Sequence, residues 1–225
     1  PTMNKIKIFS TPHKALRKLM AEFSLLAGKT DYANESEIQA LKQLGNEMFD
    51  LLKEHAHIEE SLVLTALEAK APGASEENIE EHEQLEKVQA ELEEWLNSFD
   101  ASQSEEEGFQ FYLAFSSYHG QYLEHIIHEE TNTQELLWKH LTDEELMGLH
   151  MQILKSIPFE IFLVWGKHIT PAQTRKENLA MLTGMKMMLP APAFEKIVSV
   201  IQASVSANEY YELMTELGKL PAKAA

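Results

Sequence analysis

The stretches LLKEHAHIEESLVL, residues 51–64, and YLEHIIHEET, residues 122–131, each place a glutamate four positions after a histidine: His55 with Glu59, and His125 with Glu129. Residues four apart on a helix project from the same face one turn apart, so each pair can present an imidazole and a carboxylate to one point. The apolar residues around each pair keep the same spacing of three and four. Both stretches therefore predict helices that turn these polar pairs towards a protein core.

The predicted core-facing stripes extend from these pairs in both directions. One stripe reads Leu44, Met48, Leu51, His55, Glu59, Leu62 and Ala66, and the other reads Phe111, Phe115, Tyr118, Tyr122, His125, Glu129 and Leu136. Two more histidines occupy equivalent positions: His13 precedes Leu16, Met20, Phe23 and Ala27, and His82 lies among Ile79, Leu85, Gln89, Leu92 and Leu96. Each of four helices thus carries one inward histidine, and two of them also carry an inward glutamate.

Helix-start and helix-stop signals place those helices along the chain. We expect them at about 11–28, 34–70, 75–99 and 105–140, with Thr11, Asn34 and Ser75 as N-caps. Short connections between helices favour an antiparallel arrangement. The predicted fold class is therefore all-α, with an antiparallel four-helix bundle over residues 1–141 and a C-terminal helical extension of unknown role over residues 142–225.

The composition excludes several classes of function. The chain of 225 residues contains no cysteine, so structural disulfides, iron–sulfur clusters, thiolate zinc sites and cysteine nucleophiles are excluded. A formal net charge of −17 argues against nucleic acid and anionic membranes as partners. The sequence shows neither a secretory signal pattern nor an apolar stretch long enough to span a membrane, and we expect a cytoplasmic protein.

Six polar groups that face each other inside a bundle require a chemical explanation. A helix rises about 1.5 Å per residue, and by this measure the four inward histidines fall at one level. A single buried histidine is usually an ordinary core residue, but burying two carboxylates with four imidazoles is costly without a cation. If each glutamate bridges, each of two ions receives two histidines and one oxygen from each carboxylate. We therefore expect two ions with a bridging oxide or hydroxide, most naturally iron, with manganese or zinc as alternatives.

Four segments resemble the hemerythrin-like, or HHE cation-binding, family: TPHKALRKL, LLKEHAHIEESLVL, EEHEQLEKV and YLEHIIHEET, one on each predicted helix and in the family's order. The resemblance covers roughly residues 10–140. It implies a di-iron site whose metal ligands are His13, His55, Glu59, His82, His125 and Glu129. Ferritin-like proteins also hold di-iron in helical bundles, but these pairs do not reproduce their Glu-x-x-His motif.

The sequence departs from the pattern of the oxygen-carrying hemerythrins at two positions. Glu86 replaces their second histidine on the third helix, and Glu130 replaces their fourth-helix aspartate, five residues after the histidine. The set of four histidines and two glutamates is more similar to that of bacterial iron–sulfur repair proteins. We expect a protein that binds or reacts with oxygen, nitric oxide or peroxide, in redox or nitrosative defence or in iron–sulfur repair.

The alternative is a non-catalytic oxygen carrier, an iron store, or a sensor of oxygen or iron, in which residues 142–225 contact a protein partner.

Glu60 and Glu130 are expected to point to solvent. In the metal-free site, repulsion between Glu59 and Glu129 is expected to keep a proton on one of the two carboxylates.

Overall fold

The computed structural model describes residues 5–219, and every regular element within that range is helical. The predicted all-α fold class is confirmed. The chain divides into two compact units, one ending at Ser156 and the other beginning at Ile157. The boundary expected after residue 141 lies before this division, so the first unit is longer than the predicted bundle.

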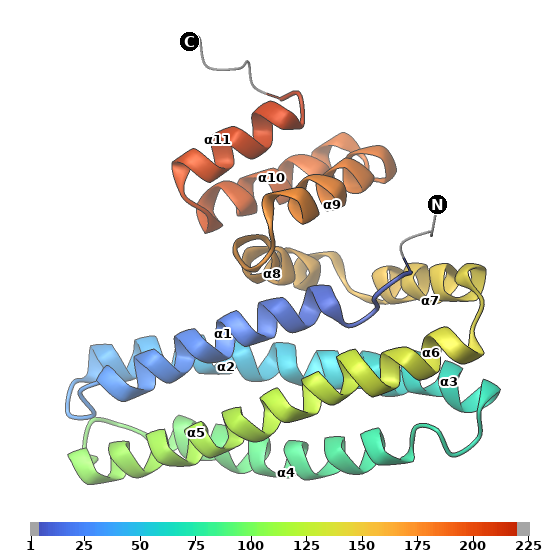
Figure 1. Ribbon diagram of the computed structural model, residues 1–225. Helices are drawn as coiled ribbons and strands as arrows, with labels where there is room; N and C mark the ends of the chain where they lie inside the picture. Colours follow the sequence, from blue (N-terminus) through green and yellow to red (C-terminus); the bar gives the residue numbers. More distant parts are fainter. Residues whose placement is uncertain (1–4, 220–225) are drawn as a thin grey trace. The chain divides into compact units, whose positions relative to one another are not determined.

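Four long helical segments form the core of the first unit (Figure 1). Two of them are single helices, α1 (Ser10–Lys29) and α4 (Glu76–Ser98). The other two each contain three parts: α2 (Glu35–Ile58), η1 (Glu59–Leu64) and α3 (Thr65–Lys70) in one, and α5 (Glu105–His128), η2 (Glu129–Thr133) and α6 (Gln134–His140) in the other. Both α1 and α4 pack on α2 and on α5, which closes the predicted four-helix bundle.

The helix starts show which of the predicted caps the chain uses. The side chain of Asn34 accepts hydrogen bonds from two backbone N–H groups in the first turn of α2, as expected of an N-cap. The other two predicted caps make no capping hydrogen bond, although Ser75 does occupy the N-cap position of α4. Helix α1 begins at Ser10, before Thr11, and has no side-chain cap. The hydroxyl of Ser75 donates to Glu68 Oε2 at 2.6 Å instead of capping α4.

Both interrupted segments contain a π-helical turn, and each turn begins at a predicted inward glutamate. Segment η1 begins at Glu59 and segment η2 begins at Glu129. A π turn closes its hydrogen bonds from residue i to i+5, so it holds one residue more than an α turn. Such turns are rare in α-helices and occur frequently at functional sites.

The extra residue shifts the buried face of each helix by one position. Beyond η1 the sequence pattern predicts Leu62 and Ala66 at the core, whereas the structure fully buries Val63 and Leu67. The same offset follows η2, where Leu137 is buried in place of the residue before it. The predicted stripes are therefore wrong beyond the two glutamates, because they assume an uninterrupted α-helical period.

Beyond the π turns, a separate apolar cluster closes one end of the bundle. Helix α7 (Asp143–Ser156) buries Leu146 and Leu149 there. The other buried members come from the N-terminal segment and from the last turns of the two interrupted helices: Ile8, Phe9, Val63, Leu67, Leu137 and Leu141. Because α7 shares this core, the compact unit continues past residue 141 to Ser156.

The second unit consists of α8 (Phe159–Ile169), a 3₁₀ turn η3 (Thr170–Ala172), α9 (Arg175–Met188), α10 (Ala191–Ser204) and α11 (Ala207–Glu216). It has a core of its own, formed by Leu182, Phe194, Ile197, Val198, Ile201, Leu213, Met214 and Leu217. Within residues 5–219 no single helix has the length and apolar composition to cross a membrane. One pair of helical segments, Asp143–Ser156 and Phe159–Ala172, has that length and composition only when the two are counted together, and the chain bends sharply between them.

Close packing between α2 and its neighbours depends on Gly45. A Cβ atom at this position would lie 2.4 Å from Leu96 Cδ2 and 2.7 Å from Phe23 Cε2, and both of these side chains are fully buried. We predict that Gly45→Ala lowers the free energy of unfolding by roughly 1–3 kcal/mol, because overpacking displaces the neighbouring side chains. Urea unfolding followed by circular dichroism measures the change.

Gly120→Ala is the matched control, since Gly120 is an exposed residue of α5 with no atom within 4 Å of its would-be Cβ. This substitution should raise the free energy of unfolding by about 0.5–1 kcal/mol, the usual gain when alanine replaces glycine inside a helix. Equal effects of the two substitutions would contradict the close approach at Gly45.

Candidate metal centre

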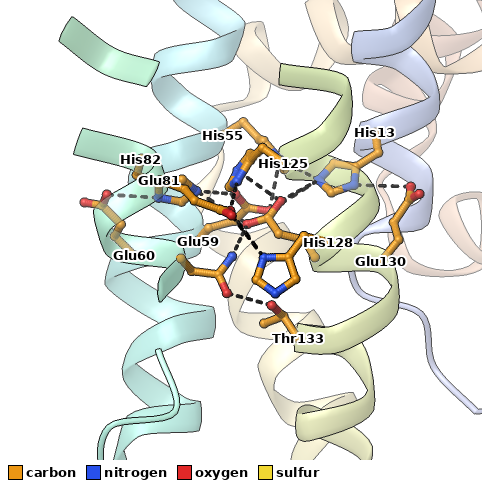
Figure 2. A network of polar contacts seen from close by, with 12 residues as sticks. His13, His55, Glu59, Glu60, Glu81, His82, His125, His128, Glu130 and Thr133 are labelled. Atoms are coloured by element: carbon orange, nitrogen blue, oxygen red, sulfur yellow. Dashed lines mark hydrogen bonds and ion pairs between the residues drawn. The ribbon is translucent and has the colours of Figure 1, made fainter. Parts of the chain in front are cut away.

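The six residues singled out by the sequence converge within the bundle, and Figure 2 labels five of them: His13, His55, Glu59, His82 and His125. The histidines come from four different helices: His13 from α1, His55 from α2, His82 from α4 and His125 from α5. Glu59 and Glu129 are the first residues of the two π turns. All six side chains are buried, and Glu129 is 0% exposed to solvent.

The donor atoms form two groups that share both carboxylates. One group contains His13 and His55, the other contains His82 and His125, and within each group the donor atoms lie within 4.8 Å of one another. His55 Nε2 lies 3.0 Å from Glu59 Oε1, and His82 Nε2 lies 3.5 Å from Glu59 Oε2. This glutamate therefore turns one oxygen towards each group.

The second shared carboxylate, Glu129, also contacts both groups. Its Oε2 lies 3.3 Å from His13 Nε2, and its Oε1 lies 3.4 Å from His82 Nε2. The Nε2 atoms of His13 and His55 are 3.0 Å apart, as two nitrogens directed at one point would be. Both carboxylates therefore contact imidazoles of both groups, and each group contains two imidazoles.

Three of the four shared carboxylate oxygens have no hydrogen-bond partner: Glu59 Oε1, Glu59 Oε2 and Glu129 Oε2. The fourth, Glu129 Oε1, accepts a hydrogen bond of 3.0 Å from Asn78 Nδ2, and Thr133 Oγ1 in turn donates to Asn78 Oδ1 at 2.6 Å. Buried carboxylate oxygens without donors are energetically costly, and coordination to a cation removes that cost. Imidazole nitrogens mixed with carboxylate oxygens suit iron, manganese or zinc, so the residues present fit a metal site.

A second set of carboxylates contacts the outer nitrogens of three histidines. Each oxygen–Nδ1 distance is short: 3.2 Å from Glu130 to His13, 3.0 Å from Glu60 to His82, and 2.7 Å from Glu81 to His125. Such a partner makes Nδ1 the donor, fixes the orientation of the ring and leaves the Nε2 lone pair directed at the centre. The carboxylates thus prepare the imidazoles for metal ligation.

The expectation that Glu60 and Glu130 point to solvent is wrong. The two terminal nitrogens of Arg17 each donate a hydrogen bond of 2.7 Å to Glu130, one to each carboxylate oxygen. Glu60 keeps 40% of its side chain exposed but still reaches His82. The spacing along one helix carries no signal for either contact, because each depends on a side chain that reaches a neighbouring helix.

Two of the four inward histidines, His13 and His82, have a raised pKa in the metal-free protein. Burial disfavours a charged His13, but contacts with Glu129, Glu130 and Glu59 outweigh burial and raise the pKa of this histidine well above its ordinary value. The same balance raises the pKa of His82 to about 11. Burial raises the pKa of Glu59 and of Glu129, and the predicted repulsion from Glu59 raises that of Glu129 further, but the surrounding imidazoles lower both. The expected protonated carboxylate is therefore a wrong prediction, since the histidines take up the protons.

The remaining candidates lie outside both donor groups. Glu86 occupies the position at which oxygen-carrying hemerythrins have a second histidine on their third helix, and it is exposed on α4. Tyr122 is buried with its ring 5.8 Å from that of His125, and burial raises the pKa of its phenol. The Tyr118 hydroxyl donates to Gln89 at 2.9 Å. In the described part of the chain no seventh histidine or carboxylate joins either group.

A buried set of imidazoles and shared carboxylates inside an antiparallel bundle defines a cation-binding helical bundle. A family model described as the hemerythrin HHE cation binding domain matches residues 4–147. The chain therefore belongs to the hemerythrin-like, HHE cation-binding family, and the predicted resemblance is confirmed. The match includes all members of both donor groups. A comparison with curated proteins gave no match.

Metal binding must displace the protons that His13 and His82 hold at neutral pH. We predict that Co²⁺ binding at pH 7 releases roughly two protons per chain, and that affinity increases with pH because fewer protons remain to be displaced. Calorimetric titration in buffers of different ionisation enthalpy gives the number released.

The variant His82→Gln carries one titrating group fewer and should release about one proton fewer. The exposed His57→Gln is the matched control, and its proton release should equal that of the unmodified protein. Binding without proton release at pH 7 would contradict the placement of the protons on the imidazoles.

Proposed function

We propose that the protein holds two iron ions and uses them to bind or react with a small oxidant such as oxygen, nitric oxide or hydrogen peroxide. The proposed ligands are His13, His55, Glu59, His82, His125 and Glu129. One observation carries the proposal: the two donor groups share both carboxylates. Two ions would use every donor of both groups, whereas a single ion would leave one pair of buried imidazoles without a cation.

The formal charges around the centre support two divalent ions. Five carboxylates contact the four histidines, namely the two shared glutamates together with Glu60, Glu81 and Glu130. Arg17 donates to both oxygens of Glu130 and adds one positive charge to this set. Five negative charges and one positive charge leave −4, which two divalent ions neutralise and one ion does not.

The equivalence of the two donor groups favours a reactive centre over an oxygen carrier. Each group offers two imidazoles and both carboxylates, so neither proposed ion would have more protein ligands than the other. Exposed Glu86 does not supply the additional ligand that would create such a difference. Bound iron would supply open coordination positions and electrons for a small oxidant, which suits redox or nitrosative defence or iron–sulfur repair.

Aromatic and apolar side chains enclose the centre. The ring of Phe9 stacks on that of His13 with centroids 5.5 Å apart, and Tyr122 contacts His125 edge-on. These walls limit access of bulk water, and electrostatic interactions inside are stronger in consequence. A small uncharged oxidant can enter such a site more easily than a charged metabolite can.

Two expectations about the cellular context remain proposals. One is a cytoplasmic location. The other is that part of residues 142–225 contacts a protein partner, as a sensor would require. The helices from Phe159 onwards have a core of their own, so such a contact would not need to disrupt the bundle.

The first test of the proposal is metal stoichiometry. Protein loaded with Fe²⁺ without oxygen should contain about two iron atoms per chain by elemental analysis, since two shared carboxylates bridge two positions. Glu59→Gln should lower the count, because one bridge loses its charge. Glu86→Gln makes the same change at an exposed position of α4 and should keep the full count. One iron per chain in the unmodified protein would exclude a dinuclear centre.

The second test separates a reactive centre from a carrier. We predict that the reduced iron protein, mixed with oxygen, is oxidised and does not recover its reduced absorption spectrum when oxygen is removed. Two equally open positions allow a small molecule to contact both ions, so further electron transfer competes with its release. An absorption band that disappears under argon and returns in air would instead identify an oxygen carrier.

A further inference from the structure

A third group of potential metal ligands lies outside the centre. It consists of Glu77 and Glu81 on α4 and His128 on α5, whose donor atoms lie within 4.8 Å of one another. His128 Nε2 is 3.5 Å from Glu77 Oε2, and His128 Nδ1 is 3.3 Å from Glu81 Oε1. The side chains are 16%, 75% and 33% exposed for His128, Glu77 and Glu81, so this group is open to solvent, unlike the centre.

Glu81 connects the outer group to the centre (Figure 2). Its Oε2 lies 2.7 Å from Nδ1 of His125, one of the proposed ligands, and both of its oxygens lie 3.3 Å from Nδ1 of His128. A cation held by Oε1 would leave Oε2 in contact with His125. The same carboxylate can therefore serve both sites without being withdrawn from either.

A pocket of about 740 Å³ provides a second connection. Its lining includes Glu77 and His128 of the outer group, together with Asn78 and Thr133. Asn78 is only 2% exposed and donates to Glu129 Oε1 at 3.0 Å. The pocket thus extends from the outer group to a side chain that directly contacts a shared carboxylate of the centre.

The other charges of this pocket do not explain an attraction for cations. Lys5 and Lys139 line it together with Glu135, so the two lysines offset the two lining glutamates. Any affinity for a cation must therefore come from local coordination. An imidazole beside two carboxylates is a donor set that divalent transition metals accept.

We propose that Glu77, Glu81 and His128 form a capture site for a divalent cation, which then passes along the pocket to the metal centre. Three partly exposed ligands bind a cation more weakly and exchange it faster than four buried ligands on each side of the centre. This order of affinities directs the cation inwards. The capture site stands independently of the dinuclear centre, whereas delivery rests on the proposed function.

The test compares Glu77→Gln with Glu76→Gln in the chain of 225 residues. Both residues are exposed in the first turn of α4, and both substitutions remove one negative charge there, but only Glu77 belongs to the capture site. Titration with Co²⁺ should detect one weakly bound ion in the unmodified protein and in Glu76→Gln, and that ion should be lost in Glu77→Gln. Equal numbers of weakly bound Co²⁺ in the two variants would overturn the capture site, whatever number the centre holds.

Delivery is measured as the rate at which Fe²⁺ becomes inaccessible to a colorimetric chelator under anaerobic conditions. Glu77→Gln should slow this step about tenfold, in the range by which local charge and capture raise association rates, with an unchanged final amount of protected iron. Glu76→Gln should load at the unmodified rate. A normal loading rate in a Glu77→Gln protein that has lost the weak ion would overturn delivery, and failure of all three proteins to protect iron would overturn the dinuclear centre instead.

Discussion

Two buried carboxylates require positive charge nearby, and the rest of the bundle is arranged to provide it. Glu59 and Glu129 are almost completely removed from solvent, and three of their four oxygens accept no hydrogen bond. An ionised carboxylate in such a place needs nearby positive charge, or the fold loses several kcal/mol. Protonated imidazoles provide that charge in the metal-free protein, and a bound cation provides it in the metal-bound one. His13 and His82 serve both states because they lie against the same two carboxylates.

The outer carboxylates make the exchange of protons for metal possible without rearrangement. Glu130, Glu60 and Glu81 contact the Nδ1 atoms, and these contacts do not depend on whether Nε2 carries a proton or faces a metal. Burial disfavours the ionised form of Glu130, but contacts with His13 and Arg17 outweigh burial and lower the pKa of this carboxyl to about 2. The site is thus shaped before metal arrives, and metal affinity is not reduced by the cost of folding the site.

The sequence predicts the bundle and the convergence of six side chains because both depend on a period that the chain repeats many times. His13, His55 and Glu59 keep the spacing of the apolar residues around them, so the facing side can be derived from a helical wheel. The contacts of Glu60 and Glu81 depend on side chains reaching a neighbouring helix, which a pattern along one helix does not contain. The missing capping hydrogen bond of Ser75 also depends on a residue outside α4, since Glu68 accepts the hydrogen bond that the Ser75 hydroxyl donates. Proton placement requires the balance of burial against several contacts, and this balance exists only in the assembled site.

The π turns have an evolutionary consequence for the two interrupted helices. The part before Glu59 must align with the centre, while the part after it must align Val63 and Leu67 with the separate cluster around α7. In an unbroken α-helix these alignments are tied together, whereas one additional residue in the turn separates them. Loss of that residue from a descendant gene would let the turn close as an ordinary α turn, and the next apolar residue would take the position that an unbroken period assigns to the core. A lineage can therefore gain or lose one codon at this turn without exchanging the apolar and polar positions downstream, whereas the same change elsewhere in the helix would rotate everything beyond it by about 100° relative to the centre.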